Sequence, residues 1–374
     1  MANFPCIRTT RFGQGDSAEI GVAHRAARIL RLATIWAQTP RRHGDPTNSI
    51  RRIGYDALYM SGHLYGLALL ISLLVAGFAA QFVRPDTARC AAAVGSLDGV
   101  PASLRRALDA RGFRPVKTPE RMDWLANHQE PGQGIDQFIG GRPNLPDNRR
   151  RRIYLLPLGD LDHSGGPPVA KLVEFSRAFF GLETAVLPAL DLRQLPIMRR
   201  LNPTTHTPQT LTTDVLAVLK VRLPSDGYAL LGVTMEDLYP AAEWNYVFGQ
   251  ASLQDRVGVY SFARYDPKRY GAKRTDPERV MLRRSCHILA HETGHMFGIA
   301  HCIWYQCLMN GSNHLDEFDG QPLHLCPVDL RKLQWSVGFD VADRYRRLLA
   351  FYEQAGFADE ADWLRSRLRL IEVG

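Results

Sequence analysis

The chain of 374 residues is long enough to bury a sizeable core, and its 45% hydrophobic and 22% charged residues are typical of an ordinary globular protein. Six cysteines in this length exclude a disulfide scaffold, and no internal repeat or low-complexity tract is evident. The net charge of +8 is modest, and no RNA-binding motif accompanies the sharpest basic run, at 149–152. We therefore interpret that run as a solvated loop and expect no nucleic-acid partner.

The first part of the chain, residues 1–57, is rich in arginine and weakly patterned. A segment of this kind buries little apolar surface, so we predict a poorly ordered basic extension with a helix around 18–38. A hydrophobic helix follows at 58–84, and its residues 64–83 carry no charged side chain. This run is long enough to span a bilayer core, and the excess of arginines before it would place the N-terminus inside.

Two other interpretations of the hydrophobic run stay open. It could be a buried helix of a globular domain, or translation could begin further along the chain, for example at Met60. The membrane interpretation conflicts with thiolate metal ligands, which favour a reducing compartment. The expected location is therefore the cytoplasm, and the alternative is a single-pass membrane protein anchored by residues 64–83.

The rest of the chain is more clearly patterned. Residues 85–150 are predicted to be a helical lead-in and a linker punctuated by proline and glycine. From residue 151 onward strands alternate with helices, which predicts an α/β (α+β) domain with a mixed, twisted sheet. The expected strands are 152–158, 183–187, 228–234 and 256–264, and the expected helices are 169–180, 209–220, 341–352 and 358–370.

The stretch HETGHMFGIAH places three imidazoles and one carboxylate where a catalytic zinc needs them. His291 and His295 are four residues apart, so on a helix they share one face and can bind one metal. Gly298 can adopt the positive φ that ends a helix, which would return His301 as the third ligand. Three protein ligands leave a position open for water, and Glu292 is placed to act as its general base.

The flanking residues support a helix through this motif. The sequence TDPE at 275–278 is typical of a helix start, and apolar residues recur at helical spacing from 280 to 297. The alternative is a core helix whose histidines are only hydrogen bonded, and three histidines and a glutamate at this spacing argue against it. Met309 follows downstream, as in the metzincin pattern, where a tight turn places a methionine beneath the metal.

Residues 291–309, together with Cys302, Cys307 and the later Cys326-Pro327-Val328-Asp329, resemble the archaemetzincin family. Further segments carry the resemblance, which covers about 95–355: residues 233–240, 244–251, 261–265, 311–315 and 330–334. It implies a metzincin-like metallopeptidase domain at 151–374, a peptide or protein substrate, and a second, structural zinc held by four cysteines.

The sequence departs from that family pattern at one ligand. Cys302, Cys307 and Cys326 match the family's cysteines, but Asp329 stands where the fourth is expected. A carboxylate oxygen can bind zinc, although less well than a thiolate. His314 and His324 are alternative fourth ligands, and the loss of this zinc with retention of reduced, buried cysteines is also open.

The strand predicted at 256–264 is a candidate for substrate binding. In metzincin-like folds an edge strand above the zinc pairs with the extended backbone of the substrate. We assign this role to 258–263, with Val259, Tyr260 and Ser261 as the expected contacts, although an internal strand would have the same sequence pattern. We expect the protein to be a monomer.

The resulting functional hypothesis is zinc-dependent hydrolysis of peptide bonds. Glu292 would take a proton from a zinc-bound water as the water attacks the scissile carbonyl, and would pass it to the leaving amine. Two alternatives are a catalytically silent zinc-binding interaction protein and a zinc hydrolase that acts on a non-peptide amide.

Overall fold

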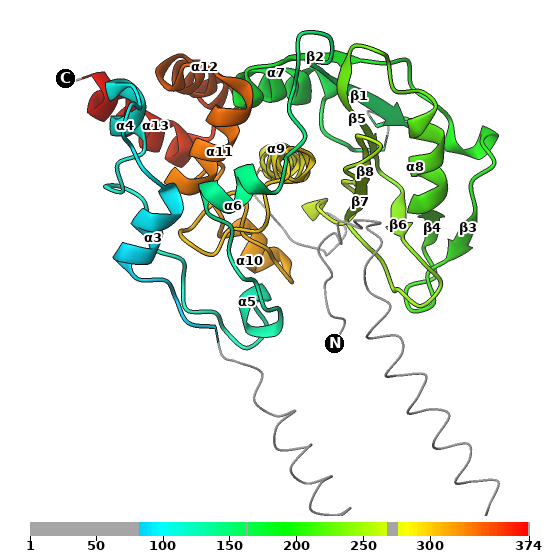
Figure 1. Ribbon diagram of the computed structural model, residues 1–374. Coiled ribbons are helices and arrows are strands. Elements are labelled where there is room, and N and C mark those ends of the chain that lie inside the picture. The colour runs from blue at the N-terminus through cyan, green and yellow to red at the C-terminus, as the bar shows by residue number, and fades with distance from the viewer. Residues whose placement is uncertain (1–81, 162–163, 268–275, 373–374) are drawn as a thin grey trace, which may run out of the picture. The chain divides into compact units, whose positions relative to one another are not determined.

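The computed structural model describes residues 82–161, 164–267 and 276–372 (Figure 1). The extension predicted at 1–57 lies outside these residues, and so does the hydrophobic run at 64–83 except for its last two residues. No helix in the described ranges has both the length and the apolar content needed to cross a bilayer.

Within the described residues, the main sheet has five strands in the order β2-β1-β5-β8-β7. β1 is parallel to both β2 and β5, β5 is parallel to β8, and β7 is antiparallel to β8. The bounds are β1 Arg152–Leu158, β2 Glu183–Val186, β5 Gly227–Thr234, β7 Gly249–Ser252 and β8 Val257–Ser261. A second sheet, ordered β3-β4-β6, contains β3 Arg199–Leu201, β4 Pro208–Leu211 and β6 Asp237–Tyr239.

The main sheet is buried on both faces, which explains why its central strands are almost continuously hydrophobic. Alternate side chains of β1 enter different cores: Ile153 and Leu155 pack into the larger cluster, while Tyr154 and Leu156 pack into the smaller one. Helices cover both faces, with α9 (Pro277–Met296) on one side of the strands and α8 (Thr212–Lys220) on the other (Figure 1). The mixed α/β fold expected from the sequence is confirmed.

Most of the helices after β1 extend the larger core, whereas α8 packs into the smaller one through Val215 and Leu219. Their bounds are α7 Val169–Phe180, α8 Thr212–Lys220, α9 Pro277–Met296, α10 Leu315–Asp319, α11 Pro327–Val337, α12 Val341–Gln354 and α13 Ala358–Glu372, with a short 3-10 helix at Leu192–Gln194. α7 packs against α9 and α12, and α12 packs against α13. The central helix α9 lies between the sheet and the C-terminal helices (Figure 1).

The predicted linker at 85–150 is part of the same compact unit as the rest of the described chain. Its helices are α3 Thr87–Val94, α4 Ala102–Ala107, α5 Trp124–Asn127 and α6 Ile135–Gly140. Their buried side chains, including Leu104, Phe113 and Phe138, belong to the larger core, and α4 packs on α13. Proline and glycine therefore mark the turns between short, packed helices, and the segment does not separate two domains.

Two sequence predictions are wrong in the region of the sheets. The helix expected at 209–220 begins only at Thr212, because residues 208–211 form β4 and pair in parallel with β6. The strand assigned to the sheet edge at 258–263 is internal, because β8 pairs with β5 on one side and with β7 on the other. The strand at this edge of the sheet is β7, and β2 forms the opposite edge.

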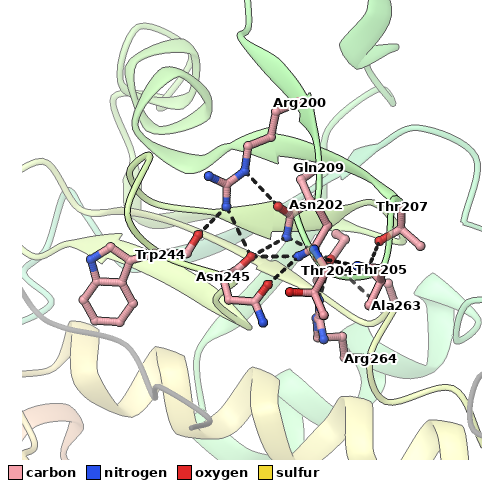
Figure 2. Close-up of polar contacts among 12 residues, drawn as sticks. Arg200, Asn202, Thr204, Thr205, Thr207, Gln209, Trp244, Asn245, Ala263 and Arg264 are labelled. Carbon is pink, nitrogen blue, oxygen red and sulfur yellow. Dashed lines mark hydrogen bonds and ion pairs between the residues drawn. The ribbon is translucent and has the colours of Figure 1, made fainter. Parts of the chain in front are cut away.

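A buried polar network joins the second sheet to the loop that leads into β7 (Figure 2). Asn202, which is fully buried, donates to the carbonyl and side-chain oxygens of Asn245 and accepts from two backbone amides of its own turn. Arg200 donates to Gln209 and to the carbonyl of Trp244. Because buried polar groups are costly when unpaired, this network holds the 244–245 loop, and hence the start of β7, against the second sheet.

The packing of the 85–150 segment generates a stability prediction. Phe138 is 1% exposed, whereas its neighbour Ile139 in the same helix is 38% exposed. Phe138→Ala should lower the free energy of unfolding by about 3–5 kcal/mol, because it leaves a cavity in the shared core. Ile139→Ala should change it by only about 0.5 kcal/mol. Urea unfolding of the full chain measures both; equal effects would show that this segment is peripheral to the core.

Candidate metal centre and active site

The helix that carries the zinc motif begins as predicted. Asp276 caps α9 by accepting a hydrogen bond from the amide of Arg279, and Pro277 occupies its first turn, where a missing N–H is tolerated. The helix ends at Met296, and Gly298 then adopts a φ of 85°. This left-handed turn reverses the chain and returns His301 toward the helix.

The three histidines predicted as ligands lie together and are largely buried. One ring nitrogen from each of His291, His295 and His301 falls in a group whose atoms are all within 4.8 Å of one another. The two Nε2 atoms of His291 and His295 are 3.0 Å apart. Two nitrogens bound to one tetrahedral zinc at 2.0–2.1 Å would be about 3.3 Å apart, so the spacing suits this metal.

The opposite ring nitrogens explain why these Nε2 atoms can act as ligands to a cation. The Nδ1 of His291 lies 2.9 Å from the Leu308 carbonyl oxygen, and the Nδ1 of His295 lies 2.7 Å from that of Ile299. A carbonyl oxygen only accepts, so both Nδ1 atoms carry the proton. Burial lowers the pKa of both rings, which are therefore neutral with unprotonated Nε2 atoms. Two facing lone pairs cannot hydrogen bond to each other, and a cation between them satisfies both.

Glu292 lies beside this cluster in a nearly closed position. Its carboxylate is 2% exposed, and neither oxygen has a hydrogen-bond partner in the described residues. Burial raises its pKa to about 8, although the charge of His301 acts in the opposite direction. The carboxylate is therefore buried beside the three histidines with no hydrogen bond from the described residues to offset its burial.

Met309 packs directly beneath the helix, as the metzincin pattern predicts. It is fully buried, and its sulfur lies so close to the backbone of Gly294 that a Cβ added there would be 2.6 Å away. Its carbonyl accepts a hydrogen bond of 2.8 Å from the amide of Cys302. Met309 therefore contacts the helix between two histidine ligands and also fixes the chain just after the third.

A second candidate metal site lies at the predicted cysteines. The sulfurs of Cys302, Cys307 and Cys326 and one oxygen of Asp329 lie within 4.8 Å of one another, and all four residues are buried. Cys302 and Cys326 have sulfurs 3.5 Å apart, too far for a disulfide. The Asp329 Oδ2 lies 3.3 Å from the Cys307 sulfur and 3.5 Å from the Cys326 sulfur. Ligands on one tetrahedral zinc would have similar separations, about 3.5 Å.

The carboxylate at this site has a buried cationic partner. The Nζ of Lys332, which is 1% exposed, lies 2.8 Å from the Asp329 Oδ1, so the other oxygen faces the sulfurs. Burial and the nearby Cys302 raise the pKa of Asp329 to about 7, and Lys332 opposes this rise. Lys332 therefore offsets part of the cost of burying a carboxylate among thiols.

The other two candidate fourth ligands lie elsewhere. The His314 Nε2 lies 3.0 Å from the Asp123 carboxylate, and its side chain caps α10. His314, Asp123 and Glu317 thus form a separate cluster. His324 stacks on Trp363 with ring centroids 3.6 Å apart. Asp329 is therefore the candidate whose ligand atom lies with the three sulfurs.

Comparison with known proteins gives consistent matches. Residues 220–335 match the model of peptidase family M54. The human protein Archaemetzincin-2 is 38% identical over 269 residues, which cover 64% of this chain and 75% of the relative. Mouse Archaemetzincin-1 is 31% identical over 259 residues, 61% of this chain and 51% of the relative. The chain belongs to the archaemetzincin family.

Archaemetzincins are zinc metallopeptidases. Two solved structures are also similar to this chain. The crystal structure of archaemetzincin from Methanopyrus kandleri is 27% identical and has a TM-score of 0.39, covering 52% of this chain and 99% of that structure. A zinc-dependent peptidase from Methanocorpusculum labreanum is 23% identical with the same TM-score, covering 48% of this chain and 99% of that one.

The substrate contacts predicted for this archaemetzincin at Val259, Tyr260 and Ser261 do not have the expected exposure. These residues are no more than 2% exposed and belong to the internal strand β8. Phe248, just before the edge strand β7, borders the site instead, because it lines a small cavity together with His291 and Glu292. The residue pattern of a strand does not show whether the strand lies inside the sheet or at its edge. The sequence alone therefore could not predict that β7, and not β8, is the edge strand.

The sequence also gave no indication that the 85–150 segment reaches the histidine cluster. The Glu130 Oε1 lies 2.8 Å from the His301 Nδ1 and accepts a hydrogen bond of 2.8 Å from the Trp124 indole. Burial alone would raise the pKa of Glu130, but the contacts with His301 and Trp124 hold it below its usual range. No local pattern links residues 171 positions apart.

The glycine turn after α9 generates a testable prediction. At the φ of 85° found for Gly298, a side chain costs about 1–2 kcal/mol, and an added Cβ would also lie 3.3 Å from Pro143. Gly298→Ala should therefore lower the free energy of unfolding by about 1–2 kcal/mol. Gly140→Ala is the control and should not lower it, because a Cβ added at Gly140 meets nothing within 4 Å. Urea unfolding compares the two; equal stability of both variants and the parent would contradict the role of the turn.

Proposed function

We propose that this archaemetzincin hydrolyses peptide bonds with Glu292 as general base and with zinc held by His291, His295 and His301. The observation that carries the proposal is the pair of facing, unprotonated Nε2 atoms beside a buried carboxylate without partners. A zinc ion held by these rings would activate water and polarise the scissile carbonyl.

The proton transfers are assigned to Glu292. Burial raises its pKa to about 8, so a nearby positive charge is needed to keep the carboxylate ionised at neutral pH. Once ionised, it takes a proton from the attacking water and passes it to the nitrogen of the leaving amine. Its closed environment keeps bulk water from competing for that proton.

The substrate backbone is proposed to lie along β7. This strand is at the edge of the main sheet, and edge strands pair with extended peptides through their backbone groups. Phe248, just before β7, lines a cavity together with His291 and Glu292. A peptide paired with β7 would thus run past the catalytic carboxylate, a role the sequence had assigned to β8.

A second, structural zinc is proposed at Cys302, Cys307, Cys326 and Asp329. The support is that the three sulfurs and one oxygen all lie within 4.8 Å of one another and that all four residues are buried. A closed set of four protein ligands is typical of a structural zinc. Free, buried thiols also suit the expected cytoplasmic location, because thiolate ligands favour a reducing compartment.

The general-base assignment is tested by Glu292→Gln. The change removes the proton acceptor and keeps the shape of the side chain, so the rate of peptide hydrolysis should fall by about 10²–10⁴-fold. Bound zinc should be unchanged, because the three imidazoles remain. The rate is measured with an unbiased peptide library, and the metal is measured by elemental analysis.

Glu278→Gln is the matched control, because Glu278 is exposed in the first turn of the same helix. It should hydrolyse peptides at the rate of the parent protein. If Glu292→Gln cleaves as fast as this control, the general-base assignment is wrong. If the parent protein binds zinc and cleaves no peptide, the chain is a silent zinc-binding protein or acts on another amide.

The metal content gives a further prediction. The parent protein should contain about two zinc ions per chain, since each site offers a ligand set of the right size and chemistry. His295→Ala and Cys307→Ala should each lower this number by about one, and the double variant should contain close to none. A single zinc in the parent that Cys307→Ala leaves unchanged would overturn the structural site.

A further inference from the structure

The three histidines are oriented in two different ways. His291 and His295 each place their Nδ1 against a backbone carbonyl, from Leu308 and Ile299. These carbonyls belong to the zinc motif and the loop that follows it. His301 lies beyond the glycine turn, and its Nδ1 is 2.8 Å from the carboxylate of Glu130, a residue from a distant part of the chain.

The Glu130 carboxylate is itself held in place. Its Oε1 accepts a hydrogen bond of 2.8 Å from the indole N–H of Trp124, whose side chain is buried. The Trp124 ring also packs edge-on against His301, with ring centroids 4.9 Å apart. Glu130 and Trp124 thus fix both the hydrogen bond and the plane of the His301 ring.

The same segment also holds the backbone that carries His301. The side chain of Gln133 donates to the carbonyl of Gly298 at 3.1 Å and accepts from the amide of Ala300 at 3.1 Å. The Trp304 indole donates to the carbonyl of Gln133 at 3.3 Å. Contacts on both sides of His301 therefore come from residues that the sequence places in a lead-in segment.

We propose that Glu130 is the positioning residue of the third zinc ligand, a proposal that rests on the zinc site proposed above. An imidazole binds zinc through Nε2 only when its proton is on Nδ1, and a carboxylate acceptor at Nδ1 stabilises that tautomer. Glu130 is placed to do this for His301, with Trp124 orienting the carboxylate. Its negative charge also favours a cation at the cluster.

The inference predicts a graded loss of affinity at the histidine site. Glu130→Gln keeps an acceptor oxygen and loses the charge, so the affinity for zinc should fall by about 10-fold. Glu130→Ala loses both the acceptor and the charge, so the affinity for zinc should fall by about 100-fold. Affinity is measured by chelator competition on the full-length protein. Glu120→Gln is the matched control, because Glu120 is exposed in the same segment. This variant should bind zinc with the affinity of the parent protein.

A spectroscopic measurement separates positioning from a general loss of structure. With cobalt in place of zinc, the ligand-field bands of the histidine site should shift in Glu130→Gln, while the thiolate charge-transfer bands of the cysteine site and the circular dichroism spectrum stay unchanged. Parental affinity and parental cobalt bands in both Glu130 variants would overturn the inference. Failure of the proposed function would look different: His295→Ala would then bind as much zinc as the parent.

Discussion

The Nε2 atoms of His291 and His295 face each other at 3.0 Å, and a cation between them would be bound by the lone pairs of both. This arrangement arises because the Nδ1 protons of both rings are committed to backbone carbonyls. Much of the surrounding structure positions the three histidines. The glycine turn after α9 returns His301 toward the helix, Met309 packs against the helix at Gly294, and the 124–133 segment contacts the His301 ring. The metal chemistry follows from hydrogen bonds made on the opposite side of each ring.

The two candidate metal sites are joined through the backbone. His301 and Cys302 are consecutive, and the amide of Cys302 donates to the carbonyl of Met309. A shift at the cysteine site would therefore be transmitted both to the third histidine and to the methionine beneath the helix. The Asp329–Lys332 pair belongs to the cysteine site, where the buried ammonium of Lys332 holds the buried Asp329 carboxylate in position among the thiols.

Strong local signals led to accurate predictions. The strand at 152–158 and the helix at 169–180 have the predicted bounds, because a buried apolar run and an amphipathic repeat are both local patterns. The helix expected from 209 begins three residues later, at Thr212, because Gln209 and its neighbours pair with β6 instead. That pairing depends on a strand far along the chain, and local propensity does not contain it.

The chemistry at the centre can be predicted from local sequence patterns. They indicate which residues offer nitrogen, sulfur and oxygen ligands, and they predict that three histidines come together. Helical spacing and a single glycine turn suffice for this, because both act over a few residues. Three features could be seen only in the folded chain. β7 lies at one edge of the main sheet, Asp329 rather than His314 or His324 lies with the cysteines, and Glu130 reaches His301. These are contacts between distant segments, and they depend on how the whole core packs.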